Sequence, residues 1–226
     1  MSIIREERIG GQRLILGDCL EVMPLLGLPE GWAILTDPPY GIGAGTGIGK
    51  VTKEGSDFRD RRQWDDTAPD LSWIAASGVP AIVWGGNYFG LPAAPGFLVW
   101  DKVQPEKFSL AMAELAWTNI KTPAKIWRWK SMSINGGAPK HHPTQKPLAL
   151  MEWCLGFLPK ATTILDPFMG SGTTLVACQK LCRQGTGIEL DPDYFEIACR
   201  RVDEATRQPD MFVTPTQAPA TQEVLL

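Results

Sequence analysis

The chain has 226 residues and a mass of 24.8 kDa, which suits one domain or at most two. Hydrophobic residues make up 44% of the sequence and charged residues 21%, as in an ordinary soluble globular protein, and the net charge is −3. No apolar stretch approaches the roughly 18–20 residues that a membrane-spanning helix needs, and the charged N-terminal segment lacks the apolar core of a signal peptide. We therefore expect a cytoplasmic protein.

Apolar runs with strand character alternate along the chain with helical patterns. This alternation predicts an α/β fold with a mainly parallel sheet and helices on both faces. The expected strands span residues 13–16, 32–36, 81–84, 97–100, 114–118, 162–165 and 185–189. The expected helices span residues 19–26, 71–76, 147–158, 173–181 and 192–205.

Two segments lack any such pattern. Residues 41–66 are rich in glycine and then carry mixed charges, which predicts a long mobile loop of the kind that is usually functional or disordered. Residues 207–226 are rich in Pro, Thr and Gln, so we expect a largely disordered tail. The predicted domain therefore spans residues 1–206.

The five cysteines form no CxxC pair, and their odd number suits reduced thiols. Cys178 and Cys182 are four residues apart on an expected helix, where small buried hydrophobic side chains are the common explanation. The spacings do not match a structural metal site, so we expect no bound metal.

Positive charge is concentrated in one segment. Residues 115–151 carry six basic and no acidic residues, which leaves −9 for the rest of a chain whose net charge is −3. Such an asymmetry is typical of a face that binds a polyanion, and interleaved tryptophans add surfaces on which bases stack. A solvated basic loop is the alternative, but we favour DNA. The predicted DNA-binding residues are Lys121, Lys125, Trp127, Arg128, Trp129, Lys130 and Lys140.

A glycine-rich stretch, 168–174, joins an expected strand to an expected helix. Its glycines allow a ligand close to the backbone, and the helix N-terminus offers unpaired N–H groups to an anion. Glu189 ends the next strand 19 residues after Gly170, about where an acidic residue meets ribose hydroxyls. Asp18, at the end of another strand, can accept a hydrogen bond from an adenine amino group. Two carboxylates and this loop suit S-adenosylmethionine better than a nicotinamide dinucleotide, although helix capping also explains both acidic residues.

The sharper motif is Asp37-Pro38-Pro39-Tyr40, which follows the strand expected at 32–36. Two successive prolines fix the backbone and leave carbonyl groups free to accept hydrogen bonds. The Asp37 carboxylate and the Pro38 carbonyl can hold the two N–H bonds of an exocyclic amine and favour a pyramidal nitrogen. That nitrogen can attack a methyl sulfonium in line, with Tyr40 stacking on a base flipped out of the duplex. A structural Pro-Pro turn is the alternative.

Four motifs together resemble one family. Residues 17–22 (GDCLEV), 36–41 (TDPPYG), 142–147 (HPTQKP) and 166–174 (DPFMGSGTT) are similar to those of the N4/N6 amino-DNA methyltransferases of bacteria and phages. The order, with Asp-Pro-Pro-Tyr before the glycine-rich loop, resembles the circularly permuted β group. The similarity covers about residues 13–202, nearly the whole predicted domain.

The resemblance implies a Rossmann-like, circularly permuted fold that uses S-adenosylmethionine, with one antiparallel strand among the strands after residue 81. It implies methyl transfer to the N6 amino group of adenine in DNA, as in restriction–modification systems. Cytosine N4 is the alternative, since the same chemistry serves a different amine. Aspartate rather than serine before Pro-Pro-Tyr favours adenine.

The resemblance also assigns roles residue by residue. It implies that Asp37, Pro38, Pro39 and Tyr40 are catalytic. Asp18 matches the contact to the cofactor adenine, Glu189 the contact to its ribose, and Thr144 and Lys146 the segment that helps to bind its carboxylate. The complete cofactor-binding set is Asp18, Cys19, Asp37, Thr144, Lys146, Asp166, Phe168, Gly170, Ser171, Gly172, Thr173, Glu189 and Leu190.

The chain departs from the family in its small recognition region. Members usually carry a sizeable insertion, and here only about residues 121–141 are available. We expect recognition to be short or relaxed, or shared with residues 41–66 or with a second subunit of a homodimer. In the tail, Gln208-Pro209-Asp210-Met211-Phe212 resembles peptides that dock on the bacterial sliding clamp, but packing against the domain is the interpretation that we favour.

Two other classes of function explain the motifs less well. A non-catalytic DNA-binding module would leave Asp37, Tyr40 and residues 170–173 intact without a use for them. A nicotinamide-dependent oxidoreductase lacks the third glycine of its fingerprint and gives Asp-Pro-Pro-Tyr no role.

Overall fold

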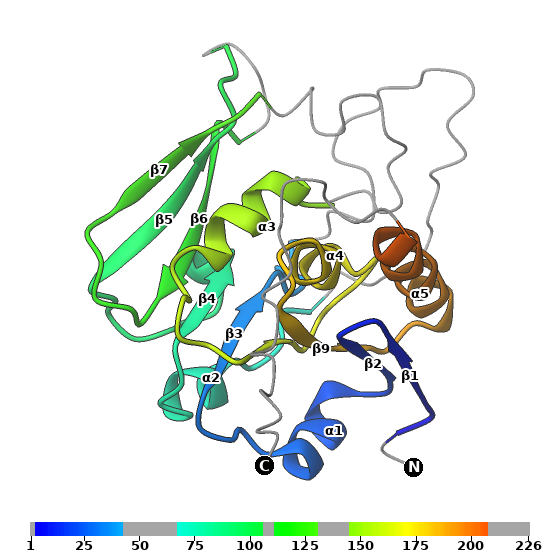
Figure 1. The fold of residues 1–226 in the computed structure, drawn as a ribbon. Coiled ribbons are helices and arrows are strands. Elements are labelled where there is room, and N and C mark those ends of the chain that lie inside the picture. Colours follow the sequence, from blue (N-terminus) through cyan, green and yellow to red (C-terminus); the bar gives the residue numbers. More distant parts are fainter. Residues whose placement is uncertain (1–2, 43–66, 106–110, 131–144, 208–226) are drawn as a thin grey trace, which may run out of the picture.

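The computed structural model describes residues 3–42, 67–105, 111–130 and 145–207, which build one sheet flanked by helices (Figure 1). The strands are β1 (Arg5–Ile9), β2 (Gln12–Leu16), β3 (Trp32–Thr36), β4 (Ala81–Trp84), β5 (Gly96–Asp101), β6 (Ala113–Thr118), β7 (Lys125–Arg128), β8 (Thr163–Asp166) and β9 (Gln184–Glu189). The helices are α1 (Cys19–Leu26), α2 (Ser72–Ala76), α3 (Leu148–Leu155), α4 (Thr173–Lys180) and α5 (Pro192–Arg207), with the short 3₁₀-helix η2 (Gly86–Tyr88).

The middle of the sheet is parallel. Its five strands lie in the order β2-β9-β8-β3-β4. β6 pairs antiparallel with both β4 and β5, and β7 forms the far edge by pairing parallel with β5. β5, β6 and β7 lie at the upper left in Figure 1. The predicted parallel sheet with an antiparallel strand after residue 81 is therefore confirmed.

The two edge strands are the elements that the sequence does not predict. β1 pairs antiparallel with β2. The described sheet therefore contains two antiparallel strands, β1 and β6, whereas only one was expected from the sequence. The sequence of β1 is REERI and that of β7 is KIWR, and most of these residues are partly or fully exposed. An edge strand has only one neighbour and tolerates charged side chains, so neither segment forms the apolar run that marks a buried strand.

Successive residues of β3 show how one sheet supports two layers of helices. Ala33 and Leu35 are fully buried in a cluster with residues of α3 and α4. Ile34 is buried in a different cluster, with residues of α1 and α2. A third cluster packs α5 against β2 and α4. Because side chains alternate along a strand, this pattern places helices on both faces, as predicted.

The neighbouring strands β8 and β3 form the point at which the order of the sheet reverses. The chain leaves β8 through α4 to β9 on one side, and leaves β3 through α2 to β4 on the other. Loops at such a point diverge and leave a crevice at the carboxyl ends of the strands, where ligands bind in open α/β sheets. The glycine-rich loop follows β8 and Asp-Pro-Pro-Tyr follows β3, so the fold brings both motifs to this crevice.

Several predictions fall outside the described residues. These are the loop from residue 43 to 66, residues 131–141 of the recognition region, and the tail from residue 208. Helix α5 continues to Arg207, the first residue of the predicted tail. Within the described parts of the chain, no helix combines the length and apolar character required to cross a membrane.

Candidate active site

A pocket of about 1220 Å³ opens at the carboxyl ends of the parallel strands. Its lining includes residues 17–20, 37–40, 166–171 and 189–192, together with Lys146. Four segments that are far apart in the sequence thus share one concave site. Small-molecule sites usually occupy roughly 300–1,000 Å³, so this pocket has room for a nucleoside-sized ligand and part of a second molecule.

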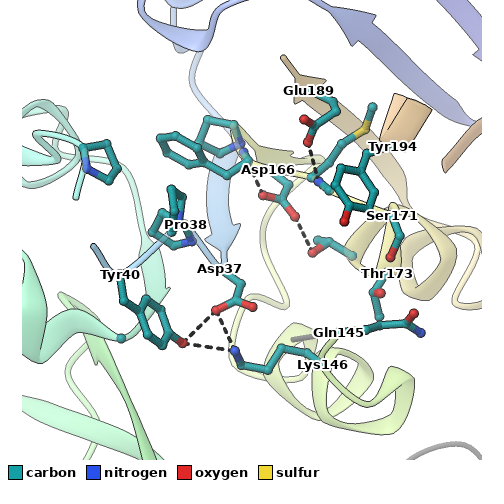
Figure 2. Close-up of a pocket in the computed structure, with 18 of the residues that line it drawn as sticks. Asp37, Pro38, Tyr40, Gln145, Lys146, Asp166, Ser171, Thr173, Glu189 and Tyr194 are labelled. Carbon is teal, nitrogen blue, oxygen red and sulfur yellow. Dashed lines mark hydrogen bonds and ion pairs between the residues drawn. The ribbon is translucent and has the colours of Figure 1, made fainter. Parts of the chain in front are cut away.

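The Asp37 carboxylate lines the pocket next to the side chains of Tyr40 and Lys146 (Figure 2). Its Oδ1 accepts hydrogen bonds from the Tyr40 hydroxyl at 2.8 Å and from Lys146 Nζ at 2.6 Å. Lys146 also donates to the Tyr40 hydroxyl at 3.0 Å. Among the described residues, no group donates to the second oxygen, Oδ2. One oxygen of Asp37 is therefore held by the protein, and the other is available to a ligand.

Glu114 and Lys102 extend this arrangement, and no sequence motif predicts a role for either residue. Glu114 is the second residue of the antiparallel strand β6, so it lies at the same edge as the ends of the parallel strands. Its Oε2 lies 3.0 Å from Lys146 Nζ, and its Oε1 lies 2.5 Å from Lys102 Nζ. The charges therefore alternate through the four side chains, from Asp37 to Lys146 to Glu114 to Lys102.

The electrostatic environment is that of partly buried, paired charges. Burial raises the pKa of Asp37, and the Lys146 ammonium opposes this rise. Burial alone would lower the pKa of Lys146, but the charges of Asp37 and Glu114 outweigh it and raise that pKa. Glu114 is also buried, yet its two lysine partners lower its pKa to about 2. At neutral pH, Lys146 and Glu114 are therefore both ionised.

Aromatic rings surround Tyr40. The Tyr88 ring stacks on it with centroids 5.0 Å apart, and the Phe89 ring meets it edge-on at 6.1 Å. Gly85 has a φ of +68°, and a Cβ atom there would lie 2.2 Å from the Tyr40 ring. Glycine is required at this position because Tyr40 packs directly on the backbone. The side chain of Tyr88 is 45% exposed and also lines the pocket.

The carboxylate of Asp166 anchors the start of the glycine-rich loop through hydrogen bonds. Oδ1 accepts a hydrogen bond from the Thr36 hydroxyl at 2.7 Å, and Oδ2 accepts one from the Thr174 hydroxyl at 2.6 Å. The backbone N–H of Phe168 donates to Oδ1 at 3.2 Å. Burial raises the pKa of Asp166 to about 6, although these hydrogen bonds oppose the rise. Both oxygens of Asp166 are thus engaged within the protein, which ties β8 to β3 and to α4.

The loop itself turns into α4 at Gly172, which has a φ of +78°. A Cβ atom there would lie 2.9 Å from the Cβ of Ala198, so the close approach of α5 also requires glycine. Arg201 of α5 donates hydrogen bonds to the Ser171 hydroxyl at 2.9 Å and to the Thr173 hydroxyl at 3.1 Å. Its role was not predicted, because α5 carries no motif that distinguishes one arginine from another.

The two acidic residues predicted at the nucleoside end both line the pocket. Glu189 accepts backbone hydrogen bonds from Gly170 at 2.9 Å and from Asp191 at 2.8 Å, and burial raises its pKa to about 7. Asp18 caps α1 by accepting a hydrogen bond from the Leu20 N–H at 2.8 Å. The capping interpretation therefore holds for Asp18. It does not exclude ligand contact, because a carboxylate accepts several hydrogen bonds.

The remaining predicted cofactor residues have different positions. Cys19, Phe168, Gly170, Ser171, Thr173 and Leu190 line the pocket, and Leu190 is 65% exposed. Gly172 shapes the turn but is not among the lining residues. Thr144 lies outside the described residues. Among the described residues, no group of three or more His, Cys, Asp or Glu side chains is arranged to hold a metal ion.

The predicted DNA-binding residues lie apart from the pocket, on and beside the edge strand β7. Lys121, Lys125, Arg128 and Lys130 are exposed, whereas Lys140 lies outside the described residues. Trp127 is half-buried and stacks on Trp129, with centroids 5.4 Å apart. Arg128 pairs with Asp101 at 3.2 Å. The described members of this set form a basic, aromatic edge to the sheet, and none of these described members lines the pocket.

The described residues thus define an α/β protein of the Rossmann-like class whose ligand pocket lies at the reversal of strand order. Comparison with known sequences defines it further. Residues 91–200 match a family model described as DNA methylase, N6_N4_Mtase. The type II methyltransferase M.HpaI of Haemophilus parainfluenzae is 35% identical over 105 residues, which are 46% of this chain and 32% of that protein. The putative methylase YubD of Escherichia coli K12 is 28% identical over 86% of this chain and 92% of its own length.

Solved structures agree in fold. The M1.HpyAVI–SAM complex has a TM-score of 0.54 at 24% identity, covering 84% of this chain and 99% of that one. The PvuII DNA methyltransferase, described as cytosine-N4-specific, has a TM-score of 0.55 at 14% identity, covering 96% and 92%. The family model and the sequence relatives support similarity to the N4/N6 amino-DNA methyltransferases, and the solved structures show the same fold. The chain spans only about a third of the length of M.HpaI and of three other type II methyltransferases that it matches, M2.MboI, M.ScaI and M2.DpnII.

Proposed function

We propose that this protein transfers a methyl group from S-adenosylmethionine to the N6 amino group of adenine in DNA. The observation that carries the proposal is the meeting, in one pocket, of the Asp37–Tyr40 segment with the glycine-rich loop, Asp18 and Glu189. The names of the relatives support it, since M.HpaI is a type II methyltransferase and the M1.HpyAVI structure is a complex with SAM.

The pocket residues fit S-adenosylmethionine by the chemistry of their donors and acceptors. Asp18 and Glu189 offer carboxylates to a nucleoside, and the N-terminus of α4 favours negative charge near the glycine-rich loop. A Cβ atom at Gly170 would meet no heavy atom within 4 Å, so the backbone there opens onto free space. When bound, S-adenosylmethionine supplies an electrophilic methyl group on a positively charged sulfur.

Asp37 and Pro38 act on the amine. Asp37 Oδ2 and the Pro38 carbonyl accept the two N–H bonds of the exocyclic amine and orient its lone pair. As the nitrogen gains positive charge, the Asp37 carboxylate stabilises it electrostatically and then accepts the proton that the nitrogen loses. Burial raises the pKa of Asp37, which makes this carboxylate a better proton acceptor than one in water.

The target base has to leave the duplex to reach this pocket, and Tyr40 offers the ring on which it stacks. Tyr88 covers one face of Tyr40, with centroids 5.0 Å apart. A base that stacks on that face therefore displaces the exposed Tyr88 ring. The exposed lysines and arginine of the β7 edge supply the charge that holds the DNA backbone.

Cytosine N4 is the second candidate, because the same acceptors serve either amine. The solved PvuII enzyme, described as cytosine-N4-specific, shares the fold. Aspartate at position 37 favours adenine by family resemblance. We further propose a cytoplasmic protein of bacterial or phage origin, with recognition by residues 121–141 that a homodimer partner can supplement. The segment that resembles a sliding-clamp peptide, Gln208–Phe212, lies outside the described residues.

The test combines cofactor binding with analysis of the product. The purified protein is incubated with S-adenosylmethionine and unmethylated bacterial DNA, and the digested nucleosides are identified by mass spectrometry. We expect N6-methyladenine with the wild type and none with D37A, and the wild type should bind S-adenosylhomocysteine in calorimetry. Detection of N4-methylcytosine instead would show that the target base is cytosine and not adenine. Normal cofactor binding with unmethylated DNA would overturn the proposal.

A further inference from the structure

Among the described residues, the ammonium of Lys146 has three oxygen partners. Its Nζ donates hydrogen bonds to Asp37 Oδ1 at 2.6 Å and to the Tyr40 hydroxyl at 3.0 Å, and it forms an ion pair with Glu114 Oε2 at 3.0 Å. The side chain is only 4% exposed. A contact from Lys146 to the cofactor carboxylate, as the family resemblance implies, would require one of these three partners to be released. In this structure Lys146 instead belongs to the reaction end of the pocket (Figure 2).

A cation this close to Asp37 presents an electrostatic problem for the reaction. The proposed role of Asp37 is to stabilise positive charge that develops on the amine. A unit positive charge 2.6 Å from Oδ1 cancels much of the field that the carboxylate exerts on that amine. An Asp37–Lys146 pair alone is close to neutral, so a further negative charge is needed.

Glu114 supplies that charge from a different part of the fold. It comes from β6, lines the same pocket and contacts Lys146 at 3.0 Å. The side chains of Asp37 and Glu114 are 20% and 21% exposed, so water screens them only in part. Lys102 holds the other oxygen of Glu114 at 2.5 Å and thereby fixes the orientation of the carboxylate.

We propose, on the basis of the proposed function, that Glu114 is a positioning residue of the methyl-transfer site. It holds Lys146 and offsets the charge of Lys146, so that Asp37 remains negative toward the amine. Lys146 in turn keeps Asp37 ionised and leaves Oδ2 facing the ligand. The site thus contains a charged triad, Asp37–Lys146–Glu114. The Asp-Pro-Pro-Tyr motif supplies Asp37 and the segment at 142–147 supplies Lys146, whereas Glu114 belongs to no motif.

The charges around Asp37 set the sign of the expected pH effect. Lys146 precedes α3, Glu114 lies on β6, Tyr40 follows β3 and Asp166 ends β8, and all four influence Asp37 or its partners. The negative charge of Glu114 raises the pKa of Asp37, and Lys146 lowers it. Replacing Glu114 by a neutral isostere therefore lowers the pKa of Asp37, whereas removing the Lys102 cation raises it.

The experiment measures kcat, the KM for S-adenosylmethionine and the pH profile of kcat for the wild type, E114Q and E152Q. Glu152 is a matched control, because it pairs with Lys180 at 3.4 Å outside the pocket. For E114Q we expect kcat to fall at least about tenfold, as when an electrostatic group is removed from an active site, with an unchanged KM. The acid limb of its profile should move to lower pH, and E152Q should match the wild type.

A second variant tests the sign and remains informative if E114Q does not fold. In K102M the acid limb should move to higher pH, opposite to the shift in E114Q. An acid limb that stays in place in the folded variants overturns the inference. So does a kcat for E114Q equal to that of E152Q.

These results are separable from the proposed function. A wild type that binds S-adenosylhomocysteine but methylates no DNA overturns the function, whatever Glu114 does. The effect of Glu114 on the pKa of Asp37 is then measured by NMR titration of the Asp37 carboxyl in the wild type and in E114Q, without substrate. A lower pKa for Asp37 in E114Q supports the triad, and an equal pKa overturns it.

Discussion

Replacement of Lys146 by methionine is the most direct test of the buried charge cluster. K146M keeps most of the volume of the side chain and removes the ammonium that contacts Asp37 at 2.6 Å and Glu114 at 3.0 Å. Removing one partner of a buried ion pair typically costs about 3–5 kcal/mol, because the remaining charge is left uncompensated. Glu114 keeps its contact with Lys102, so Asp37 accounts for most of the loss. We expect a free energy of unfolding lower by about 3–5 kcal/mol at pH 7.5.

The pH dependence of this loss gives a second, independent check. In the wild type, the pKa of Glu114 is lowered to about 2 from an ordinary value of 4.5. Its stabilising contribution is therefore complete above pH 4.5 and is lost as the pH falls toward 2. In K146M, burial and mutual repulsion place the pKa of Asp37 above its unfolded value, so protonation relieves the destabilisation. The difference between variant and wild type should shrink as the pH falls from 7.5 toward 5.

Urea unfolding followed by tryptophan fluorescence measures both effects. Trp84 is a suitable reporter, because its ring lies 5.9 Å from Lys146 Nζ in the core. K180M is the matched control, since Lys180 pairs with Glu152 at 3.4 Å with both side chains partly exposed. Such a pair contributes at most about 1 kcal/mol. A loss for K146M no larger than that for K180M, or one independent of pH, would refute the reasoning.

Three further outcomes follow from the site. Because burial raises the pKa of Glu189 to about 7, the affinity for S-adenosylhomocysteine should fall as the pH drops through 7, and E189Q should show no such dependence in calorimetry. G85A places a Cβ atom 2.2 Å from the Tyr40 ring at a φ of +68°, so melting temperature and methylation should both fall; an unaltered methylation rate would contradict this packing. R201M removes the hydrogen bonds that hold the glycine-rich loop, so its affinity for S-adenosylhomocysteine should fall about tenfold. The control R207M loses only an exposed ion pair and should bind like the wild type.

Most of the fold could be predicted because buried strands and amphipathic helices carry a local pattern. The predicted bounds of α1, β3 and β4 agree with the structure, and those of most other central elements differ by one to three residues at an end. β1 and β7 were missed because an edge strand is defined by the neighbour that it pairs with, and its own residues need not be apolar. The basic residues around β7 instead predict a polyanion-binding face, because their pattern is one of charge and not of alternating apolar side chains.

The chain by itself determined which motifs end the parallel strands, and therefore which residues meet at the crevice. Asp37, Gly170 and Glu189 could be placed together from sequence because strands of one parallel sheet end at one edge. Only the tertiary structure decided that Lys146 contacts Asp37, that Glu114 enters from an antiparallel strand, and that Arg201 holds the loop. The physical reason is that a contact between residues 30 to 109 positions apart leaves no local pattern, since neither partner's own segment needs the other in order to form its strand or helix.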